Sequence, residues 1–340
     1  MQGRVCKIGY FANNFPYFLR KKCDYIDKSH IDGKYYSPAR DLLVLYINPL
    51  KTLTHMETGN LLLIENADKS YQQAIEELEQ RHTDAAITML TELAHNGYRK
   101  AMVTLARIYY NGKGVNVDNG MAIQWLSKAA EMGSYIACWF LGNIYYDMGD
   151  TEENNRQAWK YYSLAASMRG KANFYVGRMI IENRVRNIDT IWSVGFDDDE
   201  RIEVGVSYYQ DALTAKYPLA GLYLWKMYLK YGLPDEAERL FKQGEQLMET
   251  PADYNNWAFT LSEWGEPEKA LPYIQKCMDM VGEDNMCTYM LDTYAEVLYG
   301  LGRLDESKDV FNICLMLSTH TDERRSISET KEKIRQKFAQ

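Results

Sequence analysis

The sequence has little proline, no paired cysteine motif and no long apolar run. Only 8 of its 340 residues are Pro, and its 6 Cys lack the short paired spacings of a zinc knuckle or a redox motif. No window approaches the roughly 18–20 apolar residues of a membrane-spanning helix. Positive charge is not in excess, since 39 Lys and Arg face 47 Asp and Glu, for a net charge of −8. These absences predict no transmembrane segment and no nucleic acid as a general partner.

What is present indicates a folded, helical protein. The composition is 46% hydrophobic and 13% aromatic, with 27 Tyr against 10 Phe. Such a composition favours many helices whose tyrosine rings pack while their hydroxyls reach water or a polar partner. Cys138, Cys277 and Cys314 fall at positions typical of small buried side chains. Free buried thiols favour a reducing compartment, and we expect a cytoplasmic location.

The middle of the chain is internally repetitive. Apolar residues recur 36 positions apart, and later units recur at steps of 33 and 37 residues. Within each unit the apolar residues are three and four positions apart, which predicts a pair of amphipathic helices. A hairpin of this size cannot bury its own apolar stripe, so neighbouring hairpins must stack. The pairs that define the 36-residue step are Ala101 and Ala137, Leu105 and Leu141, Tyr109 and Tyr145, Ala122 and Ala158, and Trp125 and Tyr161.

Capping and small residues support the helical hairpins. Asp118, Pro234 and Pro267 are suited to helix starts, and glycines follow the periodic segments. A small residue recurs in the middle of the first helix of a hairpin, where two helices must approach closely; Trp225 breaks this rule. The fold class that follows is all-α, a right-handed superhelix of stacked hairpins, or α-solenoid. The small residues are Ala106, Gly142, Gly177, Ala258 and Ala295.

The segment Asn111–Asp118, followed by Ala122, Trp125, Lys128–Ala130 and Gly133, resembles the Sel-one-like repeat family. Residues 217–318 resemble tetratricopeptide repeats instead, and the segment Asp292–Ser307 is especially typical of them. The two resemblances imply an interaction scaffold that binds a protein or peptide partner, and they imply no reaction and no cofactor.

Four regions follow from these patterns. Residues 1–66 match neither family, and their short apolar runs 42–47 and 61–64 fit a strand or a helix equally well. Residues 67–216 hold the Sel-one-like repeats, with a first helix from about residue 69 and an insertion near 182–203. Residues 217–318 hold the tetratricopeptide-like repeats, and residues 319–340 form a capping helix.

A solenoid's first helices line its concave side, so their non-core positions predict the partner-binding groove. The alternative is that some of these aromatic side chains pack between hairpins. The Lys and Asn clamp with which some tetratricopeptide domains hold a terminal carboxylate is not reproduced, although Asn255 occupies one suitable place. The predicted groove residues are Arg107, Tyr110, Trp139, Asn143, Tyr146, Phe174, Arg178, Asn255 and Phe259.

No residues form a convincing catalytic or metal site. The run 197–200 is acidic and could bind a cation, but the favoured explanation is a solvated loop whose acids complement the start of the next helix. The five His are scattered, and no Ser or Cys stands in a nucleophile motif. The main hypothesis is therefore a non-catalytic scaffold. One alternative is a membrane-peripheral adaptor using residues 1–40, where eight Lys or Arg face three Asp; another is a metal-dependent enzyme subunit.

Overall fold

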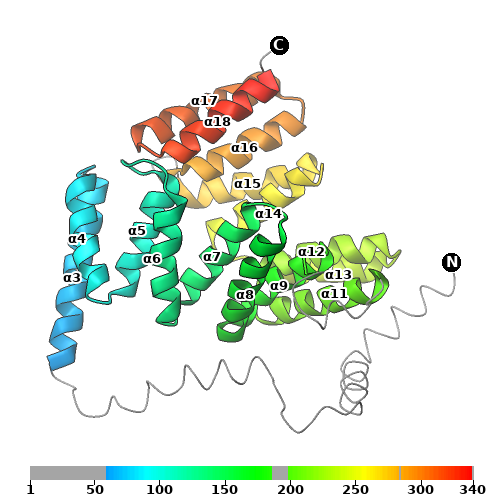
Figure 1. The fold of residues 1–340 in the computed structure, drawn as a ribbon. Helices are drawn as coiled ribbons and strands as arrows, with labels where there is room; N and C mark the ends of the chain where they lie inside the picture. Colours follow the sequence, from blue (N-terminus) through cyan, green and yellow to red (C-terminus); the bar gives the residue numbers. More distant parts are fainter. Residues whose placement is uncertain (1–58, 186–197, 283–284, 339–340) are drawn as a thin grey trace, which may run out of the picture.

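The chain forms a curved row of helical hairpins that ends in a single helix, α18 (Arg324–Phe338) (Figure 1). The computed structural model describes residues 59–185, 198–282 and 285–338, with side chains from Asn66 on. These residues contain helices and no β-strand, so the prediction of an all-α solenoid is confirmed. The hairpins are α3 (Gly59–Glu79) with α4 (Thr83–His95), α5 (Arg99–Asn111) with α6 (Asn119–Glu131), α7 (Tyr135–Asp147) with α8 (Glu152–Met168), α9 (Asn173–Ile181) with α11 (Asp198–Thr214), α12 (Pro218–Lys230) with α13 (Pro234–Glu245), α14 (Pro251–Glu263) with α15 (Pro267–Val281), and α16 (Thr288–Gly300) with α17 (Leu304–His320).

The start of the repeats differs from the expectation. The first helix was expected from about residue 69, but α3 begins at Gly59 and includes residues 61–64, for which strand and helix were both open. The predicted terminal helix is present as α18. The basic residues 1–40, the apolar run 42–47 and most of the insertion near 182–203 lie outside the described residues.

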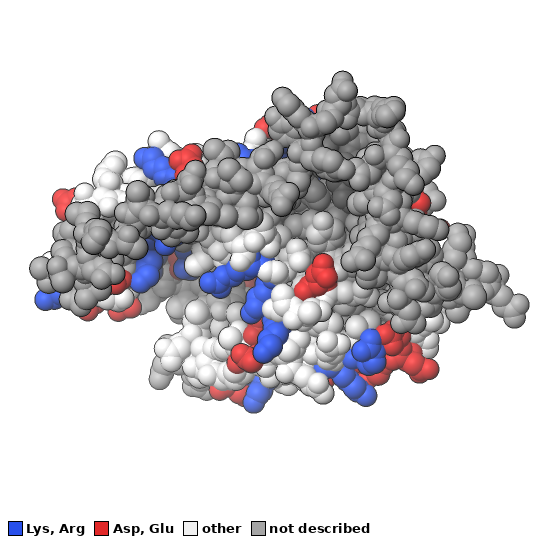
Figure 2. Space-filling model, turned by 90° about the horizontal axis from the view of Figure 1, so that it is seen from below, with Lys and Arg blue, Asp and Glu red and all other residues white. Residues whose placement is uncertain are grey.

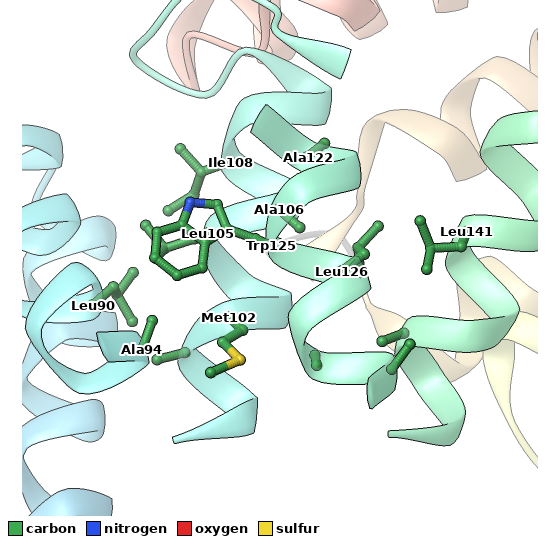
Figure 3. Close-up of a cluster of buried hydrophobic side chains, with 14 of the residues drawn as sticks. Leu90, Ala94, Met102, Leu105, Ala106, Ile108, Ala122, Trp125, Leu126 and Leu141 are labelled. Atoms are coloured by element: carbon green, nitrogen blue, oxygen red, sulfur yellow. The ribbon is translucent and has the colours of Figure 1, made fainter. Parts of the chain in front are cut away.

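The 36-residue repeat corresponds to equivalent buried positions. Ala101 and Ala137 are both 0% exposed, and the same holds for Leu105 and Leu141. Figure 3 shows Trp125 of α6 directed towards α5 and α4, among Leu90, Leu105 and Ile108. Its indole is 5% exposed. Each hairpin therefore completes the core of its neighbour, as stacking of amphipathic pairs requires.

The helix ends use the predicted signals. The Asp118 side chain accepts a hydrogen bond from the backbone N–H of Met121 at 2.9 Å, and Pro234 and Pro267 occupy first turns. Gly112 ends α5 with φ +67°, a left-handed conformation that costs glycine little. Local signals of this kind therefore predicted these helix boundaries correctly.

Small residues allow the helices of a hairpin to approach closely. A Cβ atom on Gly177 would lie 2.8 Å from the carbonyl oxygen of Gly205. In the α12–α13 hairpin, where Trp225 breaks the small-residue rule, the close approach lies one turn earlier, between Gly221 and Gly244. Trp225 packs edge-on against Phe241, with ring centroids 5.4 Å apart. The crossing point of this hairpin has therefore moved along its helices.

The first helices of the hairpins lie on the inner side of the curve. Among them, α12 contacts α14, and α14 contacts α16. Thr330 of α18 lies 37 positions after Thr293 of α16, and each is 2% exposed, so α18 takes the place of the next first helix. The row then returns on itself, because α18 contacts α5 (Figure 1). The hairpins from α5 to α17, with α18, thus complete a turn of the superhelix.

Candidate partner-binding surface

Two predicted groove residues are open side chains on inner helices. Arg107 of α5 is exposed, and it has no ion pair or hydrogen bond with another described residue. Phe259 of α14 is 42% exposed, which is high for so large an apolar side chain on a helix. Both side chains are accessible to a partner.

Trp139 and Asn143, one turn apart on α7, are half-buried. The Trp139 ring lies edge-on to Tyr175, with centroids 6.1 Å apart. The Asn143 side-chain carbonyl accepts a hydrogen bond from the Tyr162 hydroxyl at 2.8 Å. Each residue therefore packs against a neighbouring helix while keeping part of its surface open. Both alternatives predicted from the sequence, a groove surface and packing between hairpins, apply to these two residues.

Arg178 of α9 is held by a polar cluster that also contains Tyr146. The Nε of Arg178 is 2.9 Å from a Glu182 carboxylate oxygen, and the Tyr146 hydroxyl donates to the same carboxylate. The guanidinium carbons of Arg178 and Arg184 lie 4.6 and 3.6 Å from the centre of the Tyr146 ring. The arginine pair is therefore positioned over one aromatic ring, and the Arg178 side chain remains 35% exposed.

Burial and charge both act on this cluster. Burial raises the pKa of the Tyr146 hydroxyl; Arg178 opposes this shift, and the hydrogen bond to Glu182 adds to it. Tyr146 itself is only 8% exposed, so it supports the arginines rather than reaching a partner. The cluster presents a fixed guanidinium at the inner face, and its tyrosine stays neutral at physiological pH.

Phe174 and Asn255 are not surface residues, contrary to the prediction. Phe174 is 1% exposed, and its ring stacks with Tyr209 at 5.2 Å and meets Tyr223 edge-on at 4.8 Å. Tyrosines of α11 and α12 thus cover the position that the repeat register had placed in the groove. Asn255 is 6% exposed, and its side-chain oxygen has no hydrogen-bond partner within the described part of the chain.

Tyr110, the remaining predicted groove residue, is covered by the chain itself. The guanidinium carbon of Arg325, on α18, lies 4.1 Å from the centre of its ring. Arg325 was not among the predicted residues, because a repeat pattern does not indicate which helices meet after a full turn. The 37-residue step from Thr293 to Thr330 was an available signal that α18 continues the row.

Other charged features do not gather into a site among the residues described. No group of three or more His, Cys, Asp or Glu there is placed to hold a metal ion. Asp198, from the acidic run, pairs with Arg201 at 3.0 Å in the first turn of α11. No helix in the described ranges has the length and apolarity needed to cross a membrane. On the face shown in Figure 2, described side chains of both charge signs are visible.

The Sel1 repeat family matches this chain at residues 99–134 and 136–169. These segments are the α5–α6 and α7–α8 hairpins with the turns that follow them. Residues 99–134 and 136–169 are therefore two Sel1 repeats, and the resemblance inferred from the loop and alanine pattern is confirmed. The resemblance of residues 217–318 to tetratricopeptide repeats stays a prediction.

The solved structures that are similar to the chain include the following two. A Sel1 repeat protein from Oxalobacter formigenes has 17% sequence identity and a TM-score of 0.43, covering 72% of this chain and 98% of the other. A protective antigen present in uropathogenic Escherichia coli strains, displaying an SLR fold, has 18% identity and a TM-score of 0.31, covering 79% of this chain and 70% of the other. A search of curated proteins finds no significant match.

Proposed function

We propose that this protein is a non-catalytic scaffold that binds a protein or peptide partner along the inner face of its superhelix. The observation that carries the proposal is a set of accessible side chains on inner helices, namely Arg107 on α5, Trp139 on α7, Arg178 on α9 and Phe259 on α14. Stacking of the hairpins leaves these side chains at least partly uncovered. Proteins of the Sel1-repeat family generally serve as interaction scaffolds, which agrees with this assignment.

The chemistry of these side chains favours a partner with apolar anchors and carboxylates. Aromatic and arginine side chains dominate the binding energy of many protein interfaces, and truncating one at a binding centre typically costs about 2 kcal/mol or more. Guanidinium groups bind carboxylates through paired hydrogen bonds. Arg107 has no described partner of its own, so an acidic side chain could pair with it without breaking an existing contact.

The test is affinity capture with the double variant Arg107→Ala/Phe259→Ala. Both side chains are exposed, so the variant should keep the helical content and thermal stability of the parent chain. Loss of two anchors should weaken capture of a specific partner by about 100-fold or more. Binding of the purified partner is then measured by calorimetry.

The matched control is Met316→Ala with Arg335→Ala, which removes the same kinds of group from α17 and α18. Met316 is 72% exposed, and Arg335 pairs with Glu332 on its own helix. This control should bind as the parent chain does. Equal binding by the inner-face variant would refute the assignment of the surface.

A further inference from the structure

The loop between α5 and α6 and the turn between α17 and α18 lie against each other, although about 200 residues separate them in the chain. The backbone N–H of Gly114 donates to the carbonyl oxygen of Asp322 at 3.1 Å. Lys113 and Glu323 form an isolated antiparallel bridge. The two segments therefore share backbone hydrogen bonds, which fixes their register.

Two adjacent arginines complete this contact. The Nε of Arg325 donates to the carbonyl oxygen of Tyr110 at 2.7 Å, and its Nη2 donates to the side-chain oxygen of Asn119 at 2.6 Å. The same guanidinium lies over the Tyr110 ring. Arg324 donates to the side-chain oxygen of Asn116. Both guanidinium groups are thus bound by a short segment of the first Sel1 repeat.

The acceptors that bind Arg325 are neutral, so the planar shape of the guanidinium, rather than its charge, determines the binding. A backbone carbonyl, an amide oxygen and a ring face match a flat guanidinium that donates in two directions while its plane faces an aromatic ring. A lysine ammonium carries the same charge but lacks this planar fork. The carboxylates of Asp147 and Glu329 are near enough to Arg325 for their charges to interact, yet neither forms an ion pair with it.

We propose that the segment Tyr110–Asn119 is an arginine-binding site, that Arg324 and Arg325 of the same chain occupy it, and that this binding closes the superhelical turn. The closure rests only on contacts within the chain, so it can be tested without a partner. The ion pairs of Lys333 and Lys337 with Asp292 and Glu296 attach α18 to α16, so the arginine contacts are what join α18 to the α5–α6 hairpin.

A pair of engineered cysteines reports closure. Lys113→Cys/Glu323→Cys is introduced in a full-length chain whose Cys6, Cys23 and Cys287 are replaced by Ser. Bridged antiparallel residues have Cα atoms about 4.5–5.5 Å apart, which suits a disulfide. Oxidation of this engineered pair should be rapid on a non-reducing gel. Adding Arg325→Ala should slow it at least about tenfold, because two hydrogen bonds and the ring contact are lost.

Arg325→Lys separates guanidinium recognition from simple charge attraction, and Arg335→Ala is the control on the same helix. The lysine variant should be nearly as slow as the alanine variant, and the control should match the rate of the engineered pair alone. Circular dichroism confirms that each variant is folded. An unchanged rate in Arg325→Ala would overturn closure by this site, and an unchanged rate in Arg325→Lys would overturn its arginine specificity.

Two further measurements test the acceptors. Asn119→Ala should slow disulfide formation. The double variant Asn119→Ala/Arg325→Ala should be slowed by less than the two single effects combined, since both substitutions remove the same hydrogen bond. Raising salt to about 1 M shortens the screening length to about 3 Å. Closure through neutral acceptors should survive this change, and a steep fall in the oxidation rate would contradict the proposed binding mode.

Discussion

The close contact between α12 and α13 predicts that Gly221→Ala destabilises the protein, although alanine is the better helix former. A Cβ atom on Gly221 would lie 2.6 Å from the Cα of Gly244 and 2.8 Å from the carbonyl oxygen of Leu240. Both atoms belong to the backbone of α13, so no side-chain rotation can remove the clash. The two helices would have to separate along the hairpin.

The magnitude follows from two opposing effects. Replacing a helical glycine with alanine stabilises a helix by about 1 kcal/mol. Overpacking a close contact costs about 1–3 kcal/mol, and the upper end applies here because backbone atoms must move. We therefore expect a net loss of about 1–2 kcal/mol in the free energy of unfolding. Urea denaturation followed by far-UV circular dichroism measures it.

Gly120→Ala on α6 is the matched control. The nearest atom to its added Cβ is the Asp118 carboxylate oxygen that caps α6, at 3.2 Å, and no backbone atom of another helix lies within 4 Å. This variant should be as stable as the parent or slightly more so. If Gly221→Ala were equally well tolerated, the close backbone approach would not constrain this hairpin, and the reasoning would fail.

Three further outcomes are expected. Thr250→Ala should lower the free energy of unfolding by about 1 kcal/mol in urea denaturation, because Thr250 and Asp253 form a reciprocal capping box on α14. The Asp211 side chain is exposed, but partial desolvation by the protein raises the pKa of its carboxyl from the ordinary 3.8, so the ionised form weakens folding slightly at neutral pH. Asp211→Asn should therefore raise the melting temperature at pH 7, with the gain shrinking as the pH falls towards the ordinary pKa of the carboxyl; a constant gain would contradict this origin. Burial raises the pKa of the Cys277 thiol to about 11, whereas Cys287 is exposed. Peptide mapping after alkylation at pH 7 should find Cys287 modified in the folded chain and Cys277 only after unfolding.

The repeat architecture could be predicted because each unit satisfies the same local physics. Ala122 and Ala158 are both 0% exposed, since the 36-residue step repeats the same position in the core. Asp118 caps α6 because its short side chain reaches an N–H group that the first turn leaves free. Such features depend on residues a few positions apart and on contact with the next hairpin.

The errors at the binding surface arose where more than one hairpin acts on a side chain. The register placed Phe174 in the groove, but tyrosines from α11 and α12 cover it. Similarly, Trp225 stands where a small residue was expected, and the close contact of that hairpin lies at Gly221 instead. A periodic pattern predicts the direction of a side chain on its own helix. It does not predict the size of the side chains that the next two helices place against it.

Closure of the turn and occupation of the inner face should influence each other, because both involve the same end of α5. Arg107 and Tyr110 are one turn apart on one helix face, and Arg325 covers Tyr110. A partner that pairs with Arg107 therefore approaches the segment that α18 already contacts. Arg325→Ala should open this end and strengthen partner binding. By linkage, the partner should weaken closure by the same factor. Closure is measured as disulfide formation between the two engineered cysteines. We expect calorimetry and the extent of disulfide formation at equilibrium in a thiol buffer to agree on that factor; a partner with no effect on closure would show that the two surfaces act independently.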